Sequence, residues 1–268
     1  MPQRGPRIIG LPYDAASSFR RGAADAPDAI RAALHSPAGN MWSEDLQDVG
    51  GSLTDAGDVD VTPVELARQQ VEAGITAVLR DGATPIALGG DHSVTYPVMR
   101  AIHAAHGRCT ILHVDAHPDL YDEFEGDRYS HACPFARIME ERLASRLVQV
   151  GIRAMNGHQH AQADRFGVDV IDMRAWESGT RPTVGGPVYV SIDLDGIDPA
   201  HAPGVSHREP GGLTVRNVVG LVQGMRGTLV DADVVELNPS CDVDGMTARV
   251  AAKLVKELAA RMLSGERL

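Results

Sequence analysis

Short apolar runs recur along the chain, and most of them are separated by segments with the amphipathic spacing of helices. The runs are Arg7–Leu11, Pro85–Leu88, Cys109–Val114, Leu147–Val150, Val168–Ile171, Val188–Ile192 and Leu229–Val235. Strands that alternate with helices predict a parallel sheet with helices on both faces. At 268 residues the chain is long enough to bury one large core. We therefore expect an α/β fold with a mostly parallel sheet, built as a single three-layer domain over residues 1–268.

Three of the helical segments have recognisable starts. Thr62-Pro63-Val64-Glu65 has the spacing of a capping box with proline at the first helical position, which predicts a helix from there to about Arg80. Thr214 is expected to cap a second helix over Val215–Met225, and Thr247 the closing helix, which should run to about Met262.

The run Cys109–Val114 leads directly into Asp115, His117 and Asp119, which occupy alternate positions. In an extended chain, residues two apart face the same way, so this segment aims two carboxylates and an imidazole at one point. Charged groups at the end of a buried strand need compensation, and a divalent cation is the simplest one. The alternative is an ordinary strand-end turn with solvated polar side chains.

Two other predicted strands end in similar groups. Val188–Ile192 is followed by Asp193 and Asp195, and Pro85–Leu88 is followed by Gly-Gly-Asp-His92-Ser. Ligands of parallel sheets bind beyond the carboxyl ends of the strands, so we expect one shared site. Four carboxylates and two imidazoles, with no cysteine among them, suit a pair of divalent ions, manganese first, better than a structural zinc.

The net charge of −11 argues against nucleic acid or an anionic membrane as a partner, and it fits a protein that attracts a small cation. The cysteines, Cys109, Cys133 and Cys241, have no paired spacing and predict no disulfide framework. The chain shows neither a signal peptide nor an apolar run of transmembrane length. These features predict a cytoplasmic location.

Two further groups are placed to reach the predicted metal site. Glu236 follows the run Leu229–Val235 and is either a solvated terminal carboxylate or a substrate contact. The loop Tyr121–Pro134 follows the main metal-binding segment and carries several acidic residues together with His131. It is either an ordinary polar surface loop or an acidic rim in which His131 serves as an acid–base group.

Several motifs together resemble a known family. They are GGDHS at Gly89–Ser93, DAHPD at Asp115–Asp119, SxDxDxxDP at Ser191–Pro199 and EPGGLT at Glu209–Thr214. In combination they resemble the ureohydrolases, which include arginase and agmatinase, and the similarity extends over nearly the whole chain. The segments YDEFEGDRYSHACPFARIME and APGVSHREPGG look closest to the plant arginase and bacterial agmatinase-like branch. The resemblance implies an arginase-like fold and an enzyme that cleaves a guanidino compound to urea and an amine.

The resemblance also implies two manganese ions per chain, with nickel or another divalent ion as an alternative. The first ion would be held by His92, Asp115, Asp119 and Asp193, and the second by His117, Asp115, Asp193 and Asp195. Asp115 and Asp193 would then bridge the pair. The guanidinium group is a poor electrophile, so water must arrive as hydroxide, and metal binding can lower the pKa of water to about 7.

Three residues are candidates for the chemical steps. Glu236 is expected to hold the guanidinium cation by charge-assisted hydrogen bonds. His131 matches the proton-shuttling histidine of the family and is the candidate to protonate the leaving amine. Asp119 is a candidate to take the proton of the attacking water.

The identity of the substrate depends on the rim of the site. Animal-type arginases carry an acid shortly after a Gly-(Ile/Leu)-Arg turn, where this chain has Asn156, and plant arginases carry asparagine where it has Asp127. A carboxylate at Asp127 would repel the carboxylate of L-arginine, which favours the decarboxylated substrate agmatine and its hydrolysis to putrescine. L-Arginine, guanidinobutyrate and guanidine itself are the alternatives.

Two interpretations come from other classes. A non-catalytic metal-binding protein would be expected to lack a ligand, the shuttle histidine or the guanidinium-binding acid, and all of these are present. A deacetylase relative of the same fold would use one zinc, and the six-ligand set argues against it. The resemblance also implies a homo-oligomer, a trimer or a hexamer, that acts on a small cationic guanidino substrate.

Overall fold

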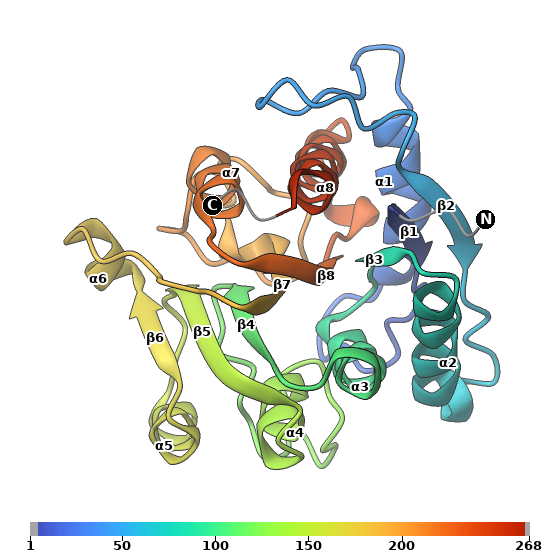
Figure 1. Ribbon diagram of the computed structural model, residues 1–268. Helices are drawn as coiled ribbons and strands as arrows, with labels where there is room; N and C mark the ends of the chain where they lie inside the picture. Colours follow the sequence, from blue (N-terminus) through green and yellow to red (C-terminus); the bar gives the residue numbers. More distant parts are fainter. Residues whose placement is uncertain (1–4, 266–268) are drawn as a thin grey trace.

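The computed structural model describes residues 5–265 and contains one parallel sheet (Figure 1). The order of its eight strands is β2-β1-β3-β8-β7-β4-β5-β6. The strands are β1 (Pro6–Gly10), β2 (Thr54–Asp58), β3 (Thr84–Leu88), β4 (Cys109–Val114), β5 (Ala144–Ile152), β6 (Asp169–Asp172), β7 (Pro187–Asp193) and β8 (Thr228–Val235). The predicted α/β fold with a parallel sheet is confirmed.

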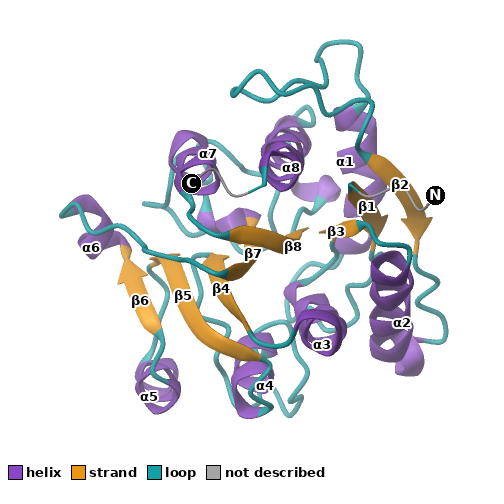
Figure 2. Cartoon of the chain, in the orientation of Figure 1, coloured by secondary structure: helices purple, strands orange, loops and turns teal. Residues whose placement is uncertain are grey.

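Helices cover both faces of this sheet (Figures 1 and 2). They are α1 (Ala26–Leu34), α2 (Ala67–Arg80), α3 (Thr95–His106), α4 (Pro134–Glu140), α5 (Gly157–Phe166), α6 (Met173–Glu177), α7 (Val215–Gly224) and α8 (Met246–Ser264). The core on one face packs α1, α7 and α8 against the strands, and the core on the other packs α2, α3, α4 and α5. Neighbouring strand residues alternate between these cores, as Ile8 and Ile9 do in β1. The result is three layers.

Edge strand β2 was not predicted from the sequence. Its sequence, TDAGD, is polar and mostly exposed, so it has no apolar run to detect. Arg31 of α1 forms ion pairs with Asp55 at 2.8 Å and Asp58 at 2.5 Å. These ion pairs are partly buried, and β2 also pairs through its backbone with β1.

One of the three predicted helix caps is confirmed. The Thr214 hydroxyl accepts a hydrogen bond from the backbone N–H of Asn217 at 3.1 Å, and the Asn217 side chain accepts one from the Thr214 N–H at 2.9 Å. The predicted capping box at Thr62 is wrong. The Thr62 hydroxyl donates to Asp60, and a short 3-10 turn over Val64–Leu66 precedes the start of α2. The predicted cap at Thr247 is also wrong, because α8 begins one residue earlier and Gly245 is its N-cap residue.

The strand order places β3, β8, β7 and β4 side by side in the middle of the sheet. Because all four run in the same direction, the loops that follow them meet at one edge. None of the helices within residues 5–265 is long and apolar enough to cross a membrane.

Candidate active site

The predicted polar residues follow the four central strands and meet at the same edge of the sheet. His92 begins the 3-10 turn after β3, Asp115, His117 and Asp119 follow β4, Asp193 and Asp195 lie at the end of β7, and Glu236 follows β8. Two close approaches of the backbone shape this edge. A Cβ on Gly90 would lie 1.8 Å from the carbonyl oxygen of Tyr13, and one on Gly196 would lie 2.8 Å from Asp115 Cα. Glycine is therefore required at both positions.

The first donor group surrounds His92. Its Nδ1 lies 2.9 Å from Asp119 Oδ2 and 3.2 Å from both Asp115 Oδ2 and Asp193 Oδ2. This nitrogen is buried and forms no hydrogen bond. An imidazole nitrogen without a hydrogen bond among three carboxylate oxygens fits a cation-binding site.

A buried relay sets the protonation of this imidazole. Ser191 Oγ donates to Asp233 at 2.6 Å, so it accepts the hydrogen bond that joins it to His92 Nε2 at 3.0 Å. With its proton on Nε2, His92 directs a free lone pair from Nδ1 toward the carboxylates. Second partners of this kind are typical of metal-binding histidines.

The second donor group lies on the other side of Asp115. His117 Nδ1 is 3.1 Å from Asp195 Oδ2 and 3.4 Å from Asp115 Oδ1. Asp115 belongs to both donor groups, one oxygen facing each, whereas Asp193 belongs to the first group and Asp195 to the second. The arrangement can hold two cations that share Asp115.

The carboxylates of these groups are crowded. Burial, reinforced by the charges of Asp195 and Asp115, raises the pKa of Asp193 well above its ordinary value. Burial and the charge of Asp115 outweigh the opposing effect of His117 and raise the pKa of Asp195 to about 7. Divalent cations would relieve this repulsion, so the residues present fit a pair of metal ions.

The predicted acid–base residues lie beside the donor groups. His131 Nδ1 is 3.5 Å from Glu236 Oε1, which also accepts a hydrogen bond from the His92 N–H at 2.8 Å. Burial alone would lower the pKa of His131, but Glu236 outweighs this effect and raises it to about 9. Glu236 and Asp119 both have left-handed backbones, with φ of 65° and 49°. Strain of this kind in residues other than glycine is concentrated at functional sites.

An N-terminal loop over residues 11–22 packs against this site. Its Ala16 N–H donates to the buried Asp91 at 3.0 Å, and its Ala16 carbonyl accepts from the His131 N–H at 3.2 Å. Ser18 Oγ lies 2.8 Å from His131 Nε2. This contact was missed because the loop is more than a hundred residues from His131 in the sequence.

A cavity of about 190 Å³ opens at these residues. It is lined by Ser18, His117, Asp119, Tyr121, Phe124, His131, Ala132, Ala154, Gln159, Asp193, Asp195, His207 and Glu236. His207, which sequence reasoning also missed, stacks on His131 with ring centroids 5.2 Å apart. Burial, with the charge of His131, lowers the pKa of His207.

The two rim residues lie outside this lining. Asp127 is exposed, and its carboxylate accepts a hydrogen bond from the Tyr129 N–H at 2.8 Å within its own loop. Asn156 caps α5, and its Nδ2 donates to the hydroxyl of Tyr121, a residue that does line the cavity. Asn156 therefore reaches the cavity through Tyr121.

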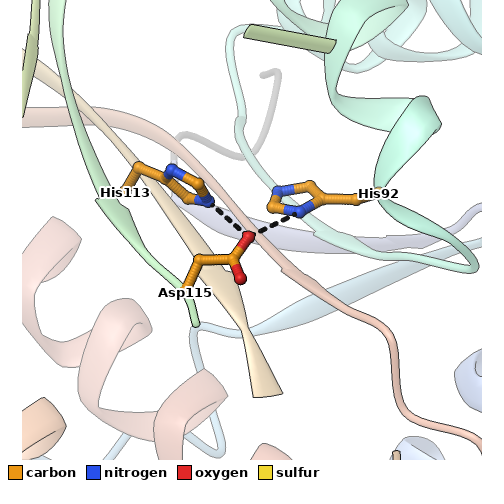
Figure 3. A group of neighbouring side chains, drawn as sticks. All are labelled: His92, His113 and Asp115. Atoms are coloured by element: carbon orange, nitrogen blue, oxygen red, sulfur yellow. Dashed lines mark hydrogen bonds and ion pairs between the residues drawn. The ribbon is translucent and has the colours of Figure 1, made fainter. Parts of the chain in front are cut away.

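Another histidine that sequence reasoning missed lies next to the Asp115 carboxylate. His113 of β4 is fully buried, and its Nε2 lies 2.8 Å from Asp115 Oδ2 (Figure 3). Figure 3 shows the Asp115 carboxylate between the rings of His113 and His92. The signal was available, because His113 continues the alternation of Asp115, His117 and Asp119 by one step toward the N-terminus.

Comparison with known proteins decides the family. The model of the Arginase family matches residues 5–260. The chain belongs to the arginase family. It is accordingly a ureohydrolase, an enzyme that hydrolyses a C–N bond of a guanidino group, and the predicted resemblance is confirmed.

Individual members of the arginase family show how the similarity is distributed. The chain is 45% identical to "Arginase 1, mitochondrial" of Arabidopsis thaliana over 95% of its length and 80% of that protein. It is 35% identical to "Agmatinase, mitochondrial" of Gallus gallus over 94% of its length and 79% of that protein. The solved arginase of Medicago truncatula superposes with a TM-score of 0.92 at 41% identity, covering 97% of this chain and 88% of that one.

Proposed function

We propose that this ureohydrolase holds two manganese ions and hydrolyses L-arginine to L-ornithine and urea. The observation that carries the proposal is the pair of buried donor groups that share Asp115, beside a cavity lined by His131 and Glu236. The donors are carboxylate oxygens and imidazole nitrogens without sulfur, a set that suits manganese. His92, Asp115, Asp119, His117, Asp193 and Asp195 would hold the pair.

Bound manganese would supply hydroxide at neutral pH to attack the guanidinium carbon. The side chains of the cavity would perform the remaining tasks. Burial alone would raise the pKa of Glu236, but His131 holds it below its ordinary value, so a charged carboxylate is available to accept hydrogen bonds from the guanidinium N–H groups. His131, protonated at neutral pH, would donate its proton to the nitrogen of the leaving amine.

The comparisons favour L-arginine over the agmatine that the rim residues suggested. The Arabidopsis arginase is 45% identical to this chain, and the Gallus agmatinase is 35% identical. The electrostatic argument for agmatine also loses its basis, because the exposed Asp127 carboxylate lies in a local turn outside the cavity lining. Helix α5 begins at the cavity, where Gln159 is part of the wall, and a helix N-terminus favours negative charge such as a substrate carboxylate.

A panel of guanidino compounds tests the proposal. The purified chain, supplied with MnCl₂, is incubated with L-arginine, agmatine, guanidinobutyrate and guanidine, and the release of urea is measured. We expect kcat/KM for L-arginine to exceed that for each other compound by at least about tenfold, a difference of roughly 1.4 kcal/mol. A kcat/KM that is higher for agmatine than for L-arginine would overturn the substrate assignment. It would support the expectation from the sequence that agmatine is the substrate. No urea from any of the four would overturn the proposed activity.

Replacing Asn156 tests whether this residue affects substrate binding through its hydrogen bond to Tyr121. Asn156→Ala removes both the α5 cap and the partner of the Tyr121 hydroxyl, so we expect KM for L-arginine to rise by roughly fivefold, equivalent to about 1 kcal/mol. Asp127→Asn is the matched control, because the new amide oxygen can still accept from the Tyr129 N–H. Its kinetics should match those of the wild type. A shift of specificity from agmatine toward L-arginine in Asp127→Asn would show that Asp127 does face the substrate.

Several expectations from the sequence stay predictions. These are the choice of manganese over nickel, the cytoplasmic location, the trimeric or hexameric assembly and the absence of nucleic-acid or membrane partners.

A further inference from the structure

His113 lies within reach of the donor groups, and its role is not obvious from position alone. It forms a compact buried group with His92 and Asp115, so it is a potential additional ligand of the first ion (Figure 3). It could instead support Asp115 without touching a metal. The hydrogen bonds on the far side of its ring decide between these roles.

Gln149 of β5 fixes the protonation of His113. The Gln149 Nε2 lies 2.6 Å from the carbonyl oxygen of Pro118 and 3.0 Å from His113 Nδ1. A carbonyl oxygen can only accept, so the amide group that faces it must be the NH₂. The same NH₂ directs its second hydrogen at His113 Nδ1, which must therefore be the unprotonated nitrogen of a neutral ring.

The proton of His113 is consequently on Nε2, the nitrogen 2.8 Å from Asp115 Oδ2. His113 donates to this carboxylate oxygen, and neither of its nitrogens has a free lone pair for a metal. The ring is also held in place by packing, since its centroid lies 4.0 Å from that of Phe135 in α4.

The second oxygen of Asp115 is held from the opposite side. Its Oδ1 accepts a hydrogen bond from the backbone N–H of His117 at 2.6 Å. The carboxylate that both donor groups share therefore has one fixed donor on each oxygen. Its rotation is blocked, so that Oδ2 faces His92 and Oδ1 faces His117.

We propose that His113 is a positioning residue, which acts with Gln149 as a donor relay that orients the Asp115 carboxylate toward both metal ions and does not itself bind either. The proposal rests on the binuclear site of the proposed function. Partners that orient metal-binding side chains typically change metal affinity by about 10- to 100-fold when they are removed.

The first test measures Mn²⁺ binding to chelator-treated full-length protein by calorimetry, together with its thermal unfolding. His113→Phe keeps a ring against Phe135 but removes the donor, and His113→Gln restores an N–H near the position of Nε2. Thr110→Val is the matched control, a buried polar-to-apolar change at the opposite end of the same strand. We expect His113→Phe to bind Mn²⁺ about 10- to 100-fold more weakly, His113→Gln to recover most of the affinity, and Thr110→Val to match wild type.

The outcomes separate the two proposals. Wild-type protein that binds fewer than two Mn²⁺ per chain would overturn the binuclear site and, with it, this role of His113. Wild-type binding of two ions with unchanged affinity in His113→Phe would overturn the positioning role alone.

A second measurement keeps the inference testable if His113→Phe does not fold. In wild-type protein labelled with ¹⁵N-histidine, the NMR shifts of His113 should report a proton on Nε2, both without metal and with diamagnetic Zn²⁺ bound. A proton on Nδ1, or loss of the Nε2 proton when Zn²⁺ binds, would show that His113 is a ligand.

Discussion

We expect the Asp115→Ala variant to lose both metal ions and its kcat to fall by more than about 100-fold. Asp115 is the one described carboxylate that belongs to donor groups on both sides, so its removal weakens both positions at once. Removing a supporting partner of a ligand already costs about 10- to 100-fold in affinity or activity, and loss of a shared ligand should cost more. Metal analysis after dialysis, together with urea release from L-arginine, measures both effects.

Two further variants make this expectation specific. Asp195 belongs only to the second donor group, so Asp195→Ala should retain about one ion per chain. Asp193 was predicted to bridge, but it lies only in the group around His92. Asp193→Ala that retains one ion would limit Asp193 to that single position, whereas loss of both ions would support bridging. Two ions retained in Asp115→Ala would contradict the shared-ligand assignment.

His131→Asn should reduce kcat by roughly 100- to 10,000-fold, the usual contribution of a general acid, while the metal content stays at the wild-type level. His131 contacts Glu236 and Ser18 and belongs to neither donor group. His160→Asn, on the exposed side of α5, is a control for loss of a histidine and should leave kcat unchanged. Loss of metal together with activity in His131→Asn would indicate that His131 is a ligand.

The pH dependence of wild-type activity is a second test of the role of His131. The pKa of His131 is raised to about 9, so the protonated form that can donate to the leaving amine persists at neutral pH. Activity that depends on it should be present below that value and fall as the pH rises through about 9. The residual activity of His131→Asn should lack this alkaline decline.

The main features of the fold and the meeting of the candidate metal ligands at one edge could be predicted because they follow from local rules. The buried strands are apolar runs, and the parallel arrangement follows from alternating strands and helices. Once strands such as β4 and β7 are parallel, Asp115 and Asp193 must come to the same edge. These inferences need only the pattern of residues near each strand end.

Other features were not predictable from local patterns. β2 is held by backbone pairing at the edge, which leaves no trace in a polar sequence. The contacts of His207 and Ser18 with His131 depend on loops that meet only in the folded chain. Sequence position also could not show that the Asp127 carboxylate accepts a hydrogen bond within its own loop. His113 was a different kind of omission, since the spacing rule applied one step earlier would have included it.

The N-terminal loop has a consequence for the order in which the working enzyme is completed. The loop leaves the ribosome early, but its partners Asp91, His131 and Asn238 are made much later. Asn238 follows β8, the last strand, and its side chain donates to the Arg20 carbonyl at 2.9 Å. A nascent chain therefore cannot complete the contacts of this loop beside His131 until nearly the whole chain has been synthesised. Pulse-labelled ribosome-bound chains that end before β8 should accordingly leave the loop open to proteases.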